Sequence, residues 1–288
     1  MKPVLLETSK GLVEFRYEGQ GPVILLLKGG HCSRDTDLSH QSLIHEGYKL
    51  LTVSRPGYDK TDIKTGKTPE DFADTLIEIL DHLAIPSVQV IAVSAAGPSG
   101  LALAFYYPER VTSLILEAAL VTPWEVRFKR KGKLLFGTAG TLVWKGLRGL
   151  LKVHPDFVMK MMLKELTTED PEKLLKQLSN QDRKFVYEML ATSHSGKGFS
   201  TDLDHQPIDL SKLTVPVLGM YAKKDGSVHY SNAILLQSLI PHSEVYEVPA
   251  DSHLIWIGEH ANAVWRKRLD FLQEHTKAAA EKQTVENR

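Results

Sequence analysis

The stretch that decides the fold is Val88-Gln89-Val90-Ile91-Ala92-Val93-Ser94-Ala95-Ala96-Gly97. An apolar, β-type run ends at Ser94 and a helical pattern begins directly after it, which predicts a tight strand-to-helix turn with the serine at its apex. Such a turn accepts only small side chains at positions 92 and 96, and both are alanine. The amide of Ala95 then points from the helix N-terminus toward any oxyanion formed at the serine. The pattern indicates either a nucleophile or a buried serine that caps an ordinary helix.

Strands and helices alternate on both sides of this turn. Strands are expected at residues 12–17, 22–27, 48–53, 88–93 and 111–116, several of them as continuous apolar blocks that are typical of strands covered on both faces. Thr68 and Pro69 supply an N-cap and a first helical residue for a helix that carries an apolar stripe as far as Leu83. The β-α-β-α-β order predicts a parallel sheet with right-handed crossovers.

The alternation stops at Pro123 and resumes after Pro207. The intervening segment is helical in pattern and rich in Leu, Met, Phe and Trp. We therefore expect one α/β core domain built from residues 1–122 and 208–288, with a helical cap inserted at residues 123–207. A chain of 288 residues is long enough to bury a core of that size.

Composition excludes several classes of function. Formal charge balances at zero, so nothing global predicts a nucleic-acid partner. Cys32 is the single cysteine, the first residues lack the apolar region of a secretion signal, and no run approaches the roughly 20 apolar residues of a membrane span. We expect a soluble, cytoplasmic protein. No metal-ligand spacing and no phosphate-binding glycine turn is present, so neither a metal nor a cofactor is expected.

A serine nucleophile needs a base, usually a histidine that is oriented by a carboxylate. Asp225 follows an expected strand at residues 215–221, and His253 follows the next strand at residues 244–248. Because the carboxyl ends of parallel strands share one edge of a sheet, we expect Ser94, Asp225 and His253 to converge.

Other residues compete for these roles. Glu117 ends the strand at residues 111–116 and is an alternative acid, whereas Asp251 is interpreted as a turn-former. Cys32 is an alternative nucleophile only if its thiol is unusually acidic. His31 and His229 are candidates for the lining of the pocket.

Further segments resemble the α/β-hydrolase family over nearly all of the chain outside residues 123–207. Lys28-Gly29-Gly30-His31 resembles its oxyanion loop, and Arg55-Pro56-Gly57-Tyr58 resembles its turn after the fourth strand. Tyr107-Pro108-Glu109-Arg110-Val111 resembles the stretch that follows its nucleophile helix. The resemblance implies a mostly parallel central sheet flanked by helices, with a helical cap.

The resemblance also implies a site. Ser94 is the implied nucleophile, His253 the base and Asp225 its orienting acid, with the amides of Gly30 and Ala95 as the oxyanion hole. This sequence departs from the family at Lys28, which replaces the usual histidine of the oxyanion loop, and at positions 92 and 96, where alanines replace glycines. The backbone amides are retained in both cases, but the Lys28 change leaves the conformation of the loop open.

The implied activity is a serine hydrolase of the carboxylesterase or lipase-like type, which cleaves carboxylic esters with apolar acyl groups through an acyl-enzyme. A second reading is a non-hydrolytic or amide-cleaving member of the same fold, such as a hydroxynitrile lyase, a cofactor-free oxygenase or an enzyme similar to proline iminopeptidases. A third reading is a ligand-binding receptor with little turnover. Ester, amide and carbon–carbon substrates are all left open.

The cap is expected to select the substrate. His31, Trp124, Phe128 and Trp144 are candidates for contact with it. From Pro123 to Leu166 the chain holds ten Lys or Arg against three Asp or Glu. A basic, amphipathic cap of this kind predicts either peripheral contact with an anionic membrane or an ordinary solvated helix face.

Overall fold

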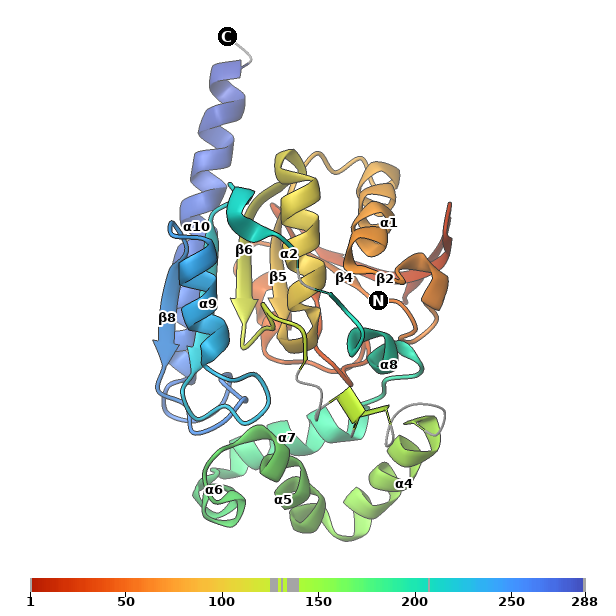
Figure 1. Ribbon diagram of the computed structural model, residues 1–288, viewed down its shortest axis with the longest axis vertical. Helices are drawn as coiled ribbons and strands as arrows, with labels where there is room; N and C mark the ends of the chain where they lie inside the picture. Colours follow the sequence, from red (N-terminus) through yellow and green to blue (C-terminus); the bar gives the residue numbers. More distant parts are fainter. Residues whose placement is uncertain (1, 125–128, 131, 134–139, 207, 287–288) are drawn as a thin grey trace.

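The computed structural model describes residues 2–124, 129–130, 132–133, 140–206 and 208–286, with side chains described as far as residue 277 (Figure 1). Within these residues eight strands form a single sheet in the order β1-β2-β4-β3-β5-β6-β7-β8. The strands are β1 (Val4–Thr8), β2 (Gly11–Gly19), β3 (Val23–Leu27), β4 (Lys49–Val53), β5 (Val88–Val93), β6 (Val111–Glu117), β7 (Val217–Ala222) and β8 (Glu244–Val248). The pairs β1–β2 and β2–β4 are antiparallel, and the other neighbouring strands pair parallel.

Helices follow the strands. They are α1 (Pro69–His82), α2 (Gly97–Tyr106), α4 (Gly140–Val153), α5 (Pro155–Leu166), α6 (Pro171–Gln177), α7 (Asn180–Thr192), α8 (Gly198–Asp202), α9 (Ser231–Leu239) and α10 (Ala261–Glu286). Helix α1 begins as expected, since the Thr68 hydroxyl accepts a hydrogen bond from the amide of Asp71 at 3.1 Å. The result is the predicted α/β architecture, a mostly parallel central sheet flanked by helices.

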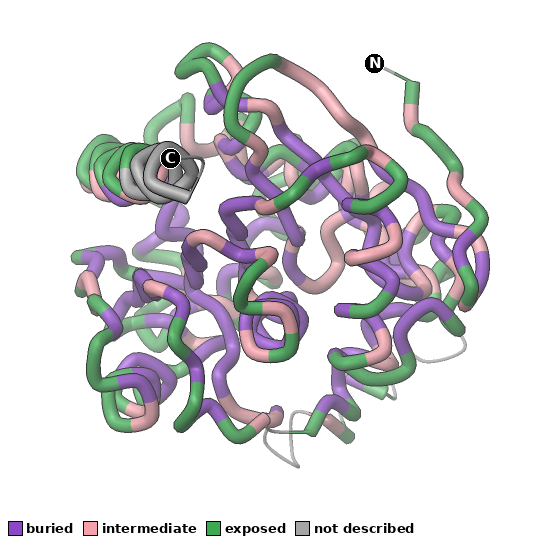
Figure 2. Tube along the Cα trace, turned by 90° about the horizontal axis from the view of Figure 1, so that it is seen from above, coloured by how far each residue is buried: buried purple, intermediate pink, exposed green. Residues whose placement is uncertain are grey.

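The sheet separates two hydrophobic cores, because successive side chains of a strand point to opposite faces. On β3, Leu25 and Leu27 pack into the core that α1, α2 and α9 cover. Ile24 and Leu26 point into the other core, which α10 covers together with helices of the segment between β6 and β7. In the burial-coloured tube of Figure 2, the interior segments are mostly buried and the exposed residues gather on outer turns.

Helices α4 to α8 lie between β6 and β7 in the chain. Figure 1 shows α4, α5, α6 and α7 grouped beyond one end of the sheet, opposite to the end from which α10 projects. The division of the chain at residues 122 and 208 into a core and a cap domain stays a prediction. Among the described residues, no helix combines the length and the apolar character needed to cross a lipid bilayer.

Candidate active site

Ser94 lies at a sharp turn between β5 and α2. Its φ of 52° is in the left-handed region, which a residue other than glycine adopts at a cost of about 1 to 3 kcal/mol. The first turn after the strand is a 3₁₀ helix (Ser94–Ala96), and the Ser94 carbonyl accepts a hydrogen bond from the amide of Leu120 at 3.0 Å. The serine is half-buried although the strand before it is fully buried. This is the geometry that the sequence predicts for the turn.

Glycines on α2 accommodate the alanines beside Ser94. A methyl group added at Gly100 would lie 2.6 Å from the Cβ of Ala92, and one added at Gly97 would lie 2.1 Å from the carbonyl oxygen of Leu120. The close approach of helix and strand is therefore possible because the helix, rather than position 92, carries the glycine. The sequence pattern alone did not single out these two glycines.

The Gly29–Gly30 loop after β3 lies directly against this turn. A Cβ built on Gly29 would be 3.0 Å from the Cβ of Ser94, and one built on Gly30 would be 3.3 Å from the Cβ of Ala95. On its other side Gly30 contacts the ring of Phe199 in α8, to which the same Cβ would come within 2.9 Å. The structure thus brings together the two backbone segments that the sequence analysis assigned to an oxyanion hole.

Arg55 anchors the start of this loop. Its Nε donates to the carbonyl oxygen of Lys28 at 2.7 Å, and its Nη1 pairs with Asp202 of α8, which also accepts a hydrogen bond from the Tyr58 hydroxyl at 2.6 Å. Arg55, Tyr58 and Asp202 are all buried. The Lys28 side chain turns away to the carbonyl of Arg34, at 2.7 Å. The replacement of histidine by Lys28 therefore does not displace the Gly29–Gly30 loop, which stays in contact with the Ser94 turn.

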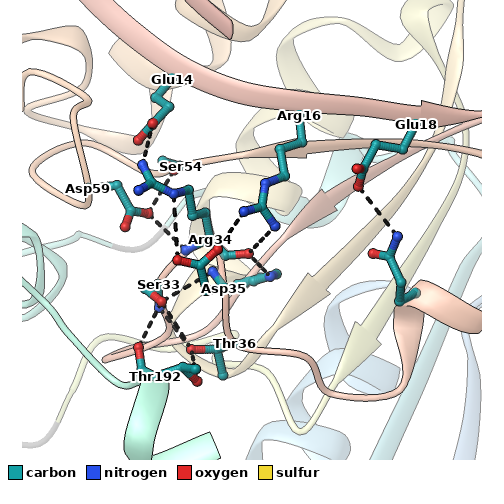
Figure 3. Close-up of polar contacts among 12 residues, drawn as sticks. Glu14, Arg16, Glu18, Ser33, Arg34, Asp35, Thr36, Ser54, Asp59 and Thr192 are labelled. Carbon is teal, nitrogen blue, oxygen red and sulfur yellow. Dashed lines mark hydrogen bonds and ion pairs between the residues drawn. The ribbon is translucent and has the colours of Figure 1, made fainter. Parts of the chain in front are cut away.

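The segment after the loop is tied to three other elements (Figure 3). The Ser33 hydroxyl donates to the carbonyl of Thr192 at the end of α7, at 2.7 Å, and the amide of Arg34 donates to Asp59 at 2.9 Å. The Arg34 guanidinium pairs with the buried Glu14 of β2. These contacts hold the loop from the sheet side and from the helical segment together.

We expect Asp202→Asn to loosen the Lys28–Gly30 loop, because the variant removes the charge that holds Arg55 in place. Misplacement of an oxyanion donor by about 1 Å lowers rate by roughly a hundredfold. The loss should fall on kcat with little change in KM, since oxyanion contacts form chiefly in the transition state. Steady-state kinetics measure this, with the exposed Asp204→Asn as the control. A raised KM at unchanged kcat would contradict this role.

Asp225 and His253 form a buried pair. The His253 Nδ1 lies 2.6 Å from Oδ2 of Asp225, and the other carboxylate oxygen accepts from the amides of Ser227 at 2.7 Å and Val228 at 2.8 Å. Because the carboxylate only accepts, Nδ1 carries the proton and Nε2 is left as the basic nitrogen. Among the described residues no hydrogen bond joins His253 to the Ser94 hydroxyl, and contacts of this kind often tighten only when substrate is bound.

The end of α5 clamps the two loops that carry this pair. The Leu166 carbonyl accepts from the amides of His253, at 2.7 Å, and Gly226, at 3.2 Å. Thr167 forms an antiparallel bridge with Asp225, and its hydroxyl donates to the carbonyl of Asp251. Sequence reasoning did not find Leu166 or Thr167, since nothing in the local pattern of α5 distinguishes an end that packs against catalytic loops.

Glu117, the alternative acid, lies in a different network. Its carboxylate pairs with Arg268 of α10 at 2.6 Å and with Nε2 of His40 at 2.9 Å, and it accepts from the indole of Trp256. Burial opposes ionisation of Glu117, but Arg268 and His40 outweigh it and hold the pKa of the carboxyl below its usual range. Glu117 therefore serves this network, while Asp225 contacts His253.

Replacing Glu117 with glutamine should destabilise the fold by about 3 to 5 kcal/mol, because the buried Arg268 charge loses its partner. The lowered pKa means that the wild-type contribution is present above the ordinary value near 4.5 and is lost as pH falls through the folded-state value. Urea unfolding at pH 7 measures the loss, and the exposed Glu109→Gln should change stability by less than about 0.5 kcal/mol. Equal stability of the two variants would exclude this structural role.

The remaining competing residues are placed elsewhere. Asp251 pairs with Lys224 at 2.7 Å, and the His229 side chain is exposed. Burial raises the pKa of the Cys32 thiol, which favours the unreactive protonated form.

Three of the expected substrate-contacting residues form an aromatic group near Gly30. The His31 ring lies 3.9 Å from that of Phe199 and 5.2 Å from that of Trp144, whose indole donates to His31 Nδ1 at 3.3 Å. Trp124 lies 6.3 Å from Phe199 between ring centroids, and Phe128 lies outside the described residues. Burial lowers the pKa of His31 to about 3, so this ring is neutral at physiological pH.

Comparison with known proteins assigns the chain to a family. The family model described as the alpha/beta hydrolase fold matches residues 22–259. The chain therefore belongs to the α/β-hydrolase family, as its sequence resemblance predicted.

Individual relatives agree with that assignment. The chain is 32% identical over 272 residues to the uncharacterized hydrolase YcgS of Bacillus subtilis, which covers 91% of this chain and 95% of that protein. It is 27% identical to a 2-hydroxy-6-oxononadienedioate/2-hydroxy-6-oxononatrienedioate hydrolase of Cupriavidus pinatubonensis, over 81% of this chain and 78% of that protein. Among solved structures, an alpha/beta hydrolase fold protein from Nakamurella multipartita superposes with a TM-score of 0.79 at 24% identity, covering 93% of this chain and 98% of that one. This level of identity establishes the shared fold alone.

Proposed function

We propose that this protein is a serine hydrolase that cleaves carboxylic esters through an acyl-enzyme on Ser94. The observation that carries the proposal is the Asp225–His253 pair at 2.6 Å, on loops at the same sheet edge as the strained Ser94 turn and the Gly29–Gly30 loop. The contact with Asp225 orients the imidazole of His253 so that Nε2 can accept a proton, and Ser94 is the hydroxyl that this base would activate.

Each group has one task in the reaction. The Ser94 hydroxyl attacks the acyl carbon and passes its proton to Nε2 of His253, while Asp225 holds the imidazolium by its Nδ1 proton. The amides of Gly30 and Ala95 donate to the oxyanion of the tetrahedral intermediate. His253 then protonates the leaving alcohol, and water repeats the sequence on the acyl-enzyme.

The helical segment at residues 123–207 acts as the cap over this site. Phe199 of α8 contacts Gly30, and the end of α5 contacts the loops of Asp225 and His253. The aromatic group of His31, Trp144 and Phe199 lies beside the oxyanion loop, and its histidine is neutral. These features suit an uncharged, apolar acyl group better than a carboxylate.

A second candidate is hydrolysis of a carbon–carbon bond. It is favoured by the relatives that carry the name 2-hydroxy-6-oxononadienedioate hydrolase, since a substrate of that name contains no ester or amide. Such a substrate is a dicarboxylate and needs cationic partners in the pocket.

A substrate comparison separates these candidates. We expect p-nitrophenyl esters of short to medium acyl chains to be turned over, with kcat/KM rising as the acyl chain lengthens, and a 2-hydroxy-6-oxo-dienedioate to be turned over far more slowly. Loss of absorbance of the dienedioate and release of p-nitrophenolate are the two readouts. Turnover of the dienedioate alone would reject the ester proposal, and turnover of neither would favour the receptor reading.

A further inference from the structure

Large apolar side chains that face solvent are concentrated on α4 and α5. Ten such residues are exposed in the described part of the chain, and five of them lie on these two helices. The five are Leu142, Leu150, Val153, Phe157 and Met161, with Leu142 72%, Val153 70% and Phe157 59% exposed. We call the outer face of the two helices that carries them the α4–α5 surface. An exposed apolar group of this density on a protein surface marks an interaction site.

On α4 the exposed residues form a continuous stripe. It runs Leu142, Gly146, Gly149 and Val153, at spacings of three and four residues that keep one helical face. A methyl group added to either glycine would meet no atom within 4 Å, so the stripe is open to solvent along its length. Two exposed lysines, Lys145 and Lys152, flank it on one side.

The same arrangement recurs on α5, directly after the bend at Pro155. Phe157 and Met161 are exposed on one face, and Lys160 and Lys164 flank them. Both helices therefore present an apolar stripe edged with lysines. The long aliphatic part of a lysine side chain can pack along apolar surface while its ammonium group stays in water.

The charge of this surface is predominantly positive. Helices α4 and α5 together hold Lys145, Arg148, Lys152, Lys160 and Lys164 against the acids Asp156 and Glu165. Asp156 is paired with Arg183 at 2.7 Å, and Lys160 with Glu172 at 2.7 Å. Among the described residues, no ion pair involves Lys145, Lys152 or Lys164.

We propose that the α4–α5 surface docks on anionic lipid bilayers, with the apolar stripes in the interface and the lysines on lipid headgroups. Aliphatic and aromatic side chains edged with lysine are what a helix lying in the plane of an anionic interface requires. Each lysine near such a surface strengthens binding roughly fivefold. Helices α4 and α5 lie at the end of the molecule opposite to the projecting α10 (Figure 1), and the five apolar residues of the α4–α5 surface are exposed to solvent.

A second copy of this chain fits the surface less well. A symmetric dimer places the same patch on both partners, so the lysines of one copy would face those of the other. Anionic lipid complements both the apolar stripes and the charge.

Docking would hold the candidate active site close to the lipid. Helix α5 carries Phe157 and Met161 on its outer face and ends at Leu166, whose carbonyl accepts the His253 amide at 2.7 Å. The lipid-facing helix is thus the one that contacts the loops of Asp225 and His253.

Vesicle co-sedimentation tests the docking without any turnover, so it stands or fails separately from the proposed function. We expect the full chain and its Ser94→Ala variant to bind equally to vesicles with about 30% phosphatidylglycerol, and to bind pure phosphatidylcholine at least roughly tenfold more weakly. Binding should fall sharply in 0.5 M NaCl, where the Debye length is only about 4 Å.

Two double variants test the surface itself. Lys145→Glu with Lys152→Glu, and Val153→Ser with Phe157→Ser, should each weaken binding to anionic vesicles by roughly tenfold or more. The matched control for the lysine pair is Lys67→Glu with Lys212→Glu, and the control for the apolar pair is Ile234→Ser. These residues are exposed and lie outside helices α4 and α5, so the control variants should bind as the wild type does. Circular dichroism confirms that each variant is folded.

Three results would overturn the proposal. The first is negligible binding to both kinds of vesicle. The second is an equal loss of binding in the surface variants and the control variants. The third is that analytical ultracentrifugation shows a dimer which the surface variants abolish, while these variants still bind vesicles as the wild type does. The last result would assign the surface to a second copy of the chain.

Discussion

Replacing Ser94 with alanine should lower kcat for p-nitrophenyl ester hydrolysis by about 10⁶-fold, with the fold unchanged. The variant removes the attacking oxygen while it keeps a small side chain at the strained turn, where φ is 52°. Initial-rate kinetics measure the loss, and urea unfolding should show a change in stability of less than about 1 kcal/mol.

The chain offers a matched control for this variant at the other end of the same strand. Ser87 is a half-buried serine directly before β5, and Ser87→Ala should retain activity. Activity of Ser94→Ala within tenfold of the wild type would show that another group forms the covalent intermediate or that none forms.

Asp225→Asn should lower kcat by about 10⁴-fold with KM little changed. In the wild type, one oxygen of the Asp225 carboxylate accepts a hydrogen bond from Nδ1 of His253 at 2.6 Å, and the other oxygen accepts hydrogen bonds from two backbone amides. Asparagine can keep those backbone contacts with its carbonyl oxygen, but its amide then donates toward Nδ1. The imidazole would carry its proton on Nε2, so it could not accept the serine proton.

Two nearby carboxylates test this assignment. Asp251 lies two residues before His253, is exposed and pairs with Lys224, so Asp251→Asn should keep nearly full activity. Glu117→Gln should lower stability while the folded fraction stays active. If either variant lost more activity per folded molecule than Asp225→Asn, the acid would be misassigned.

The fold was largely predictable because its signals are local. Strand β3 is a continuous apolar block, β4 and β5 are mostly apolar, and α1 has both an N-cap and an amphipathic stripe. Strand β1 was not predicted. It is an edge strand of the sheet, and Val4 and Leu5 are exposed at 42% and 45%, so it lacks the alternation that marks one buried face.

The site was predictable only in part. Ser94, Asp225 and His253 each follow a strand, and parallel topology alone brings their loops to one edge. The contacts that hold these loops come from residues far away in the sequence, such as Asp202 on Arg55 and Leu166 on His253. No periodicity or motif signals such pairings, which is why the effect of Lys28 on the oxyanion loop needed the structure.

Covalent labelling tests the central claim most directly. The protein is incubated with a p-nitrophenyl phosphonate, p-nitrophenolate release is counted, and the modified peptide is identified by mass spectrometry. We predict one equivalent released and the adduct on Ser94, with no labelling of Ser94→Ala and greatly slowed labelling of His253→Ala. An adduct on Cys32 or on any other residue, or rapid labelling without His253, would contradict the account.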